Sequence, residues 1–448
     1  MKTESNKNTN KLYILLITAS GLFFKTSNAQ SIQEQIQSRI EAHTAIKLQT
    51  SYVKQSDLMM QEIKIRENPN ISFYVDSNNT LLSNMDSDND NYQKSYLNGV
   101  VELRKSLYDF GVNDLSYKEE TENKAVALLE KEQESETILY ELLKSSLDIE
   151  FLNRKINHYA AIIQRLDNEI EIQKEKYKIG TGTVTNIREV QLAKFDKQNE
   201  ISTLEGKKID IQHSITSEFG FNEEQTLEIA QFAHWVLNKA VEGGEGFTCS
   251  ENRQYQYSPN RTNALKKHYR NASNYSQERL TRQEKPTITG SVKGTAYDMV
   301  NGIKDYGISV NLNLSFTAFD GGTSELEKEK EKQSLTTTIS QIDTKSTKNI
   351  IKFSQITTSC NQQHEISQIL SAKQTELINK IDDEIFRATL VETNPATKNQ
   401  AHLELEKIKE TLLDIDNRYQ NNQLTFLLLQ EKLTDAALLK TEYTGSVK

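Results

Sequence analysis

The sequence predicts a mainly helical protein with four β-strands, in which a β-hairpin followed by a very long helix occurs twice. In the first copy Pro69 opens the hairpin, and the helical stretch of 112–178 follows it. In the second copy Pro286 opens the hairpin, and the helical stretch of 324–386 follows. A duplication on this scale predicts an internal two-fold repeat before any single residue is considered.

The predicted organisation has four parts. Residues 1–29 are a signal peptide, and 221–257 are a linker or equatorial segment. The first repeat, 30–220, contains a helix, a strand hairpin at 69–107, the long helix 112–178, a turn and a helix at 186–218. The second repeat, 258–448, contains a helix, a strand hairpin at 286–317, the long helix 324–386, a turn and helices within 395–445.

The first residues have the pattern of an export signal. Three lysines precede the apolar run Leu12–Phe24, and Ser27-Asn28-Ala29 offers the small residues of a cleavage site. The alternative is an ordinary buried helix. No later stretch of 18 apolar residues follows, so any membrane-embedded part of the mature chain would have to be built from strands.

Composition argues against several classes of function. A net charge of −9 argues against nucleic-acid binding. The two cysteines, Cys249 and Cys360, are too few for a disulfide framework; they are either bridged to each other or free. Neither has a metal-ligand spacing, and no nucleophile motif or phosphate-binding loop is recognisable. We therefore expect no catalytic residue, no cofactor and no metal site.

The strongest strand signal lies in the second hairpin. Apolar side chains occupy every second position from Tyr306 to Phe316, with Gly, Ser or Asn between them. This alternation has the length and pattern of a strand that spans a membrane, and a strand of a half-buried soluble sheet is the alternative. In the first case the lipid-facing residues are Ile308, Val310, Leu312, Leu314 and Phe316.

The long helices carry a narrow apolar stripe that is typical of coiled coils. At about 1.5 Å per residue the helix of 112–178 would be about 100 Å long. Gly180 and Gly182 end it, and Asn186 with Glu189 could form a capping box for the next helix. In the second copy Pro395 is expected to start a helix after a break at Thr389–Asn394. A competing alignment places the second turn at Tyr419.

In this order the motifs resemble the TolC-like outer membrane efflux protein family. Three features carry the resemblance: the prolines that open the hairpins, the hairpin-to-helix junctions, and the turn after the first long helix. They are Pro69 and Pro286; Tyr108-Asp109-Phe110-Gly111 and Phe319-Asp320-Gly321-Gly322; and Tyr177-Lys178-Ile179-Gly180-Thr181-Gly182-Thr183 with Asn186 and Gln191.

The resemblance implies a homotrimer in the outer membrane of a Gram-negative bacterium, extending into the periplasm. Each protomer would give four transmembrane strands to a 12-stranded barrel, and the long helical hairpins would form a periplasmic tunnel. A periplasmic adaptor and an inner-membrane pump are the implied partners, besides outer membrane lipid.

The resemblance also assigns residues. The barrel-to-helix junctions are Asp109, Gly111, Asp320, Gly321 and Gly322. The pore entrance would involve Asn186, Glu189 and Glu392, and the adaptor-docking tips would be Gly180, Thr181, Gly182, Thr389 and Thr393. Asn186 stands where the family usually has Asp, and Pro395 stands at the matching place in the second copy, which weakens the case for a ring of carboxylates.

The function implied is a passive exit duct for efflux or type I secretion, not an enzyme. The alternative is a soluble periplasmic coiled-coil protein with a structural or docking role and no transport activity. Fractionation with membranes separates these two hypotheses. A further alternative is a channel-fold relative that serves mainly as an outer-membrane assembly or docking protein, and ion conductance separates it from an exit duct.

Overall fold

The computed structural model describes residues 32–78, 96–242, 256–297, 299, 305–317, 320–390 and 395–437. The predicted signal peptide of 1–29, the predicted loop of 77–94 beyond its first two residues, and Cys249 lie outside these residues.

The chain alternates long helices with two strand pairs, in the order predicted. Residues 32–42 are helical. The elements that follow are α2 (Thr44–Ile65), β1 (Asn70–Asn78), β2 (Tyr96–Tyr108), α3 (Val112–Lys178), α4 (Val184–Phe219), α5 (Glu223–Glu242), α6 (Asn260–Gln283), β3 (Thr287–Tyr297), β4 (Asp305–Ser315), α7 (Thr323–Leu390), α8 (Pro395–Leu429) and α9 (Leu433–Ala436).

Contacts divide the chain into two compact units. The helical unit comprises Met1–Leu48, Lys131–Asn260 and Ser346–Lys448, and the sheet unit comprises Gln49–Glu130 and Arg261–Lys345. The division falls inside helices α3 and α7, so each unit draws on both halves of the sequence.

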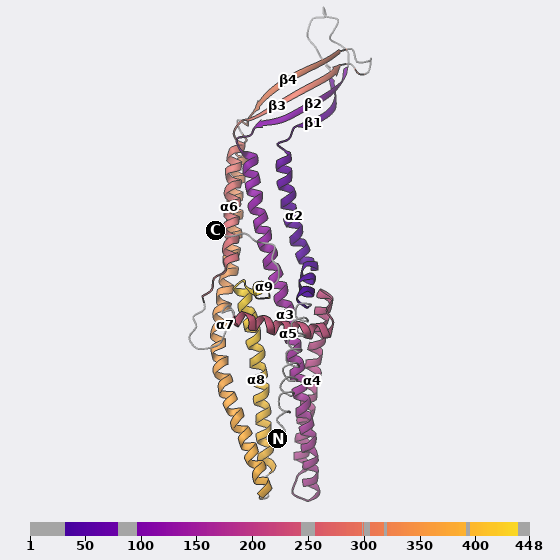
Figure 1. Ribbon diagram of the computed structural model, residues 1–448, viewed down its shortest axis with the longest axis vertical. Helices are drawn as coiled ribbons and strands as arrows, with labels where there is room; N and C mark the ends of the chain where they lie inside the picture. Colours follow the sequence, from indigo (N-terminus) through magenta and orange to yellow (C-terminus); the bar gives the residue numbers. More distant parts are fainter. Residues whose placement is uncertain are drawn as a thin grey trace, which may run out of the picture. The chain divides into compact units, whose positions relative to one another are not determined.

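The sheet unit holds a four-stranded antiparallel sheet. The strand order is β1-β2-β3-β4, so β1 and β4 are its edges and the two hairpins meet at the β2–β3 pair (Figure 1). The register of that central pair places Glu102 opposite Lys293 and Val101 opposite Gly294. Pairing between the hairpins joins segments that lie far apart in the sequence.

Both junctions from strand to helix have the same geometry. Asp109 accepts hydrogen bonds from the backbone N–H groups of Gly111 and Asn113, each at 2.9 Å. Asp320 accepts the equivalent bonds from Gly322 and Ser324, each at 2.8 Å. In this way each aspartate satisfies backbone donors that a helix start leaves without partners.

The helical unit is built from two helix hairpins and a helix that crosses them. The α3–α4 hairpin packs through Tyr159, Ile162 and Leu166, and the α7–α8 hairpin packs through a second cluster that includes Leu377 and Leu405. Helix α5 runs across the long helices (Figure 1). The largest apolar core of this unit gathers side chains from 32–46, α3, α4, α5, α8 and α9.

Helix α5 was not predicted, although the sequence carries its signals. Its buried side chains recur three or four positions apart, for example Ile229, Phe232, Ala233 and Val236. Asn222 and Gln225 exchange backbone-to-side-chain hydrogen bonds of 3.1 and 2.9 Å, which is a capping box. The segment assigned to a linker or equatorial region therefore contributes a core helix.

The prediction that Asn186 caps the next helix is wrong. Helix α4 begins at Val184, and Thr183 is its N-cap, with the side chain accepting from the Asn186 backbone N–H at 3.2 Å. Thr183 takes this role because its hydroxyl comes directly after the turn that ends α3. In the second hairpin α8 does begin at Pro395, as predicted, and it runs unbroken past Tyr419, which contradicts the competing alignment.

No helix in the described ranges is long and apolar enough to cross a membrane.

Candidate functional site

The most unusual surface of the molecule is one face of the sheet, which is apolar on all four strands except at Ser77 on β1 and Lys105 on β2. Residues paired across neighbouring strands share a face, so the register extends the alternation of β4 through β3 and β2 to β1. Val310 on β4, for example, is 79% exposed. This face carries Ile71, Phe73, Val75, Leu97, Val101, Leu103, Ile288, Val292, Ile308, Val310, Leu312 and Leu314. Phe316, predicted on the same strand, is exposed one residue beyond its end.

The opposite face of the sheet is polar and internally hydrogen-bonded. Glu102 is buried there; it accepts from the Arg104 guanidinium at 3.0 Å and from the Tyr74 hydroxyl at 3.3 Å. The Lys293 ammonium lies over the Tyr74 ring at 5.5 Å from its centroid. Ser, Thr and Asn fill much of the remaining face on β3 and β4. The sheet therefore separates an apolar side from a hydrophilic one.

Gly180 and Gly182, which were predicted to end the first long helix, lie in the turn between α3 and α4. Gly180 has a φ of 81°, in the left-handed region, and a Cβ on Gly182 would lie 2.9 Å from the Tyr177 backbone nitrogen. The backbone N–H groups of Thr181 and Gly182 both donate to the Lys176 carbonyl, which closes the end of α3. Gly180, Thr181 and Gly182 thus form one tight turn. The turn itself requires the two glycines, whether or not another protein docks there.

The other predicted tip and entrance residues are distributed differently. Asn186 and Glu189 lie in the first turns of α4, both exposed. Thr389 lies in the last turn of α7. Glu392 and Thr393 lie outside the described residues.

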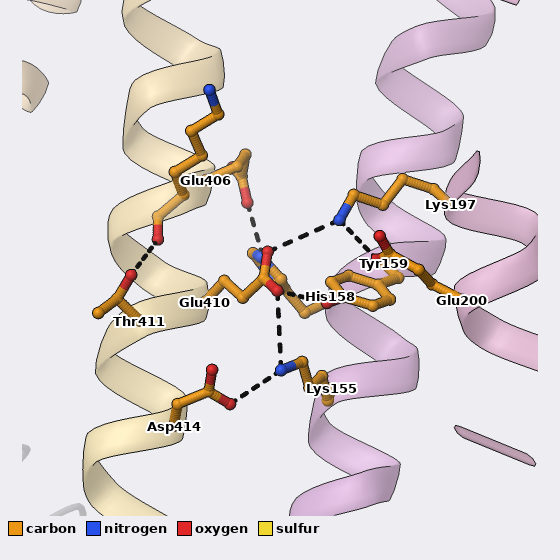
Figure 2. Close-up of polar contacts among 10 residues, drawn as sticks. Lys155, His158, Tyr159, Lys197, Glu200, Glu406, Glu410, Thr411 and Asp414 are labelled. Carbon is orange, nitrogen blue, oxygen red and sulfur yellow. Dashed lines mark hydrogen bonds and ion pairs between the residues drawn. The ribbon is translucent and has the colours of Figure 1, made fainter. Parts of the chain in front are cut away.

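A seam of charged side chains, not predicted from the sequence, joins α3 to α8. The carboxylates Glu406, Glu410 and Asp414 follow one another every four residues along α8, facing Lys155, His158 and Tyr159 on α3 (Figure 2). Lys155 binds Asp414 at 2.9 Å. Beyond Asp414 along α8, Arg154 of α3 binds Asp416 at 2.9 Å, and Asn421 donates to Asp148 at 3.1 Å. The recurrence of acidic residues every four positions along α8 was the one signal in the sequence that could have indicated this seam.

Tyr159 is the centre of this seam. Its ring is 4% exposed, its hydroxyl donates to Glu410, and the Lys197 ammonium from α4 lies 4.1 Å from the ring centroid (Figure 2). Burial and the hydrogen bond to Glu410 raise the pKa of Tyr159 well above its ordinary value. Lys155 and Lys197 each lie 3.7 Å from a Glu410 oxygen. The Glu410 carboxylate thus joins α8 to both α3 and α4.

Glu406 is the most buried carboxylate of the seam, 5% exposed. It binds Arg165 at 2.8 Å, Lys409 at 3.2 Å and His158 Nδ1 at 3.4 Å. Because a buried charge is tolerated only when it is paired, these contacts specify how α8 sits against α3.

Cys360 is disulfide-bonded and fully buried in a small cluster with Phe353 and Phe426. The other cysteine of the sequence, Cys249, lies outside the described residues, so whether it is the partner stays an open alternative. Among the residues that the structure describes, no group of three or more His, Cys, Asp or Glu side chains could hold a metal ion.

Comparison with known proteins gives matches in structure. No protein-family model and no curated protein sequence matches the chain. The outer membrane protein VceC of Vibrio cholerae has a TM-score of 0.68 at 10% identity, over 89% of this chain and 96% of its own. The CmeC outer membrane channel of Campylobacter jejuni has a TM-score of 0.68 at 8% identity, over 93% and 87%. The MtrE outer membrane channel of Neisseria gonorrhoeae has 0.65 at 9% identity, over 90% and 89%.

These neighbours are outer membrane channels of the TolC family, and each covers about nine tenths of the chain. At such low identity the likeness concerns the fold, and it agrees with the motifs read from the sequence. The chain has the fold of the TolC-family outer membrane channels.

Proposed function

We propose that this protein is a passive exit channel of the outer membrane. Three copies close their sheets into a 12-stranded barrel, and their long helices form a tunnel in the periplasm. An inner-membrane pump supplies the energy through a periplasmic adaptor. The channel lowers the barrier for its substrate because it replaces hydrocarbon with a polar lumen.

The two-faced sheet is the observation that carries this proposal. An apolar face that covers all four strands suits lipid, and a polar face suits a water-filled lumen. Its strands of 9 to 13 residues have the length that a tilted membrane-spanning strand needs. The open edges β1 and β4 would leave backbone groups without hydrogen bonds in hydrocarbon, so closure with other copies follows.

Exposed apolar side chains on the helices support assembly from several copies. Leu192 and Phe195 on α4, and Leu326 and Ile369 on α7, are each more than half exposed. Large apolar side chains that recur on long, otherwise charged helices favour packing against neighbouring helices. The neighbours in a trimer would provide that packing.

The α3–α4 turn is the proposed adaptor-docking tip. Ile179 is 73% exposed beside Gly180, and Tyr177 and Val184 are exposed on either side of it. Exposed apolar groups around a rigid turn are suited to contact with another protein. Asn186 and Glu189 would then lie near the entrance, with Thr389, Glu392 and Thr393 contributed by the second hairpin.

Planar-bilayer recording tests the proposal directly. Detergent-solubilised full-length protein is purified as its native oligomer, its mass is measured by light scattering, and it is added to one side of the membrane. A trimer that gives stable single-channel steps supports the channel. A water-soluble protein that fractionates with the periplasm and gives no conductance would overturn it and favour the structural coiled-coil alternative.

A further inference from the structure

The helical unit contains a cavity of about 590 Å³ between α3, α4 and α8. Its floor is formed by Ile162 and Leu166, which are buried in the α3–α4 contact. Ile172 and Leu403 are partly exposed at its margin. Small-molecule sites typically have volumes of about 300–1,000 Å³ and predominantly apolar linings with a few polar groups. The cavity therefore has the size and character of a small-molecule site.

The charges around the cavity are distributed unevenly. Arg165 is held at the α8 wall, where its guanidinium binds Glu406 at 2.8 Å and lies 3.4 Å from His402 Nδ1. Its positive charge is thus already matched by a carboxylate. Glu169 and Glu189 also line the cavity. The lining contains three carboxylates and one guanidinium, which disfavours an anionic ligand.

Glu189 differs from the other two carboxylates. Within the described part of the chain it has no hydrogen bond or ion pair, while Val190 and Ala193 beside it give the α4 wall an apolar surface. Glu189 is exposed at the mouth of the cavity, so a neutral apolar ligand there would displace part of its hydration without a compensating contact. A ligand with an apolar body and one positive charge would pack its body against Ile162 and Leu166 and place its charge beside Glu189.

We propose that this cavity binds a small apolar cation, with its hydrocarbon body on Ile162, Leu166 and Leu403 and its charge beside Glu189. The site lies within one chain, so it does not depend on conduction through a lumen. It also gives Glu189 a role other than the pore entrance to which sequence motifs assign it.

Tetraphenylphosphonium and tetraphenylborate are suitable probes because they share one shape and carry opposite charges. Equilibrium dialysis of each against full-length protein in detergent, with empty micelles as the blank, measures binding without any transport assay. The phosphonium should bind saturably at one site per chain, and the borate should bind at least about tenfold more weakly. Equal binding of the two ions, or no saturable binding of the phosphonium, would overturn the proposal.

Variants locate the site. Glu189→Gln keeps the shape of the side chain and removes its charge, so it should weaken phosphonium binding about fivefold to tenfold. Ala193→Trp should abolish binding because it fills the cavity from an exposed position on α4. Glu205→Gln is the matched control, since Glu205 is an exposed carboxylate on the same helix away from the cavity. Unchanged affinity in both Glu189→Gln and Ala193→Trp would place the ligand elsewhere.

Discussion

The sheet and the α3–α8 seam differ in which side chains they expose and which they bury. In the sheet, Val310 and its apolar neighbours are exposed on one face, while Glu102 is buried among polar partners on the other. In the seam, Glu406 and Tyr159 are buried between helices that expose apolar residues elsewhere. The exposed apolar face of the sheet is difficult to explain as the surface of a monomer in water.

The difference teaches that each region is adapted to its own surroundings. An apolar face that nothing in the chain covers calls for lipid or another copy, because water disfavours it. A seam of charged pairs adds little stability over apolar packing, but it discriminates between helix registers, since an unmatched buried charge is strongly unfavourable. The apolar face of the sheet thus indicates which surroundings the sheet meets, and the seam fixes how α8 aligns with α3.

The largest expected effect comes from a charge on the apolar face. Val310→Lys should cost about 2–4 kcal/mol if the side chain faces hydrocarbon at mid-depth, enough to reduce recovery of the assembled protein from outer membranes. Asn311→Lys places the same charge on the next residue, which lies on the opposite, polar face, and this variant should be tolerated. Recovery is measured by membrane fractionation and by oligomer bands in mild detergent gels. Equal recovery of the two variants would mean that this face does not meet lipid.

The seam is tested by removing its most buried charge. Glu406→Gln leaves Arg165, His158 and Lys409 without their shared carboxylate, and we expect a loss of about 2 kcal/mol in the free energy of unfolding. This is below the 3–5 kcal/mol of fully buried pairs because the Arg165 side chain is partly exposed. Urea unfolding followed by circular dichroism gives the value, with Glu404→Gln on the same helix as control. A loss equal to that of the control would show that the pairs made by Glu406 do not hold α8 against α3.

The Tyr159 hydroxyl has a smaller effect with a defined pH dependence. Tyr159→Phe should lower the free energy of unfolding by about 1 kcal/mol at pH 7, because the bond to Glu410 is lost. The pKa of Tyr159 is raised on folding, so the stability it contributes is present below its ordinary value of 10.0 and is lost as pH rises above it. The difference between wild type and variant should therefore narrow above pH 10. A difference that stays constant from pH 7 to 11 would contradict this assignment.

Two glycine substitutions separate the effect of backbone strain from the effect of side-chain packing. Gly321 has a φ of 70° and no atom within 4 Å of a built Cβ, so Gly321→Ala should destabilise by about 1–2 kcal/mol through the backbone alone. Gly206 lies within α4, also with open space around it, and Gly206→Ala should stabilise by about 0.5–1 kcal/mol. Thermal melts compare the two. Changes of the same sign would show that φ does not decide the outcome.

Much of the secondary structure could be predicted because its signals are local. Helix α3 has the bounds expected from its stripe, and Pro395 starts α8 as a proline at a first helical position does. The seam could not be predicted, because Glu406 and His158 meet only after two hairpins pack. Helix α5 was missed because the glycines after it made its segment look like a linker.

The sequence by itself determined the strands, the long helices and the aspartate junctions, since alternation, helical periodicity and turn chemistry act within a few residues. Tertiary structure alone decided which strands pair between the hairpins and which charges meet in the seam. These depend on contacts between segments hundreds of residues apart, such as Tyr159 and Glu410, and no local pattern specifies such a contact.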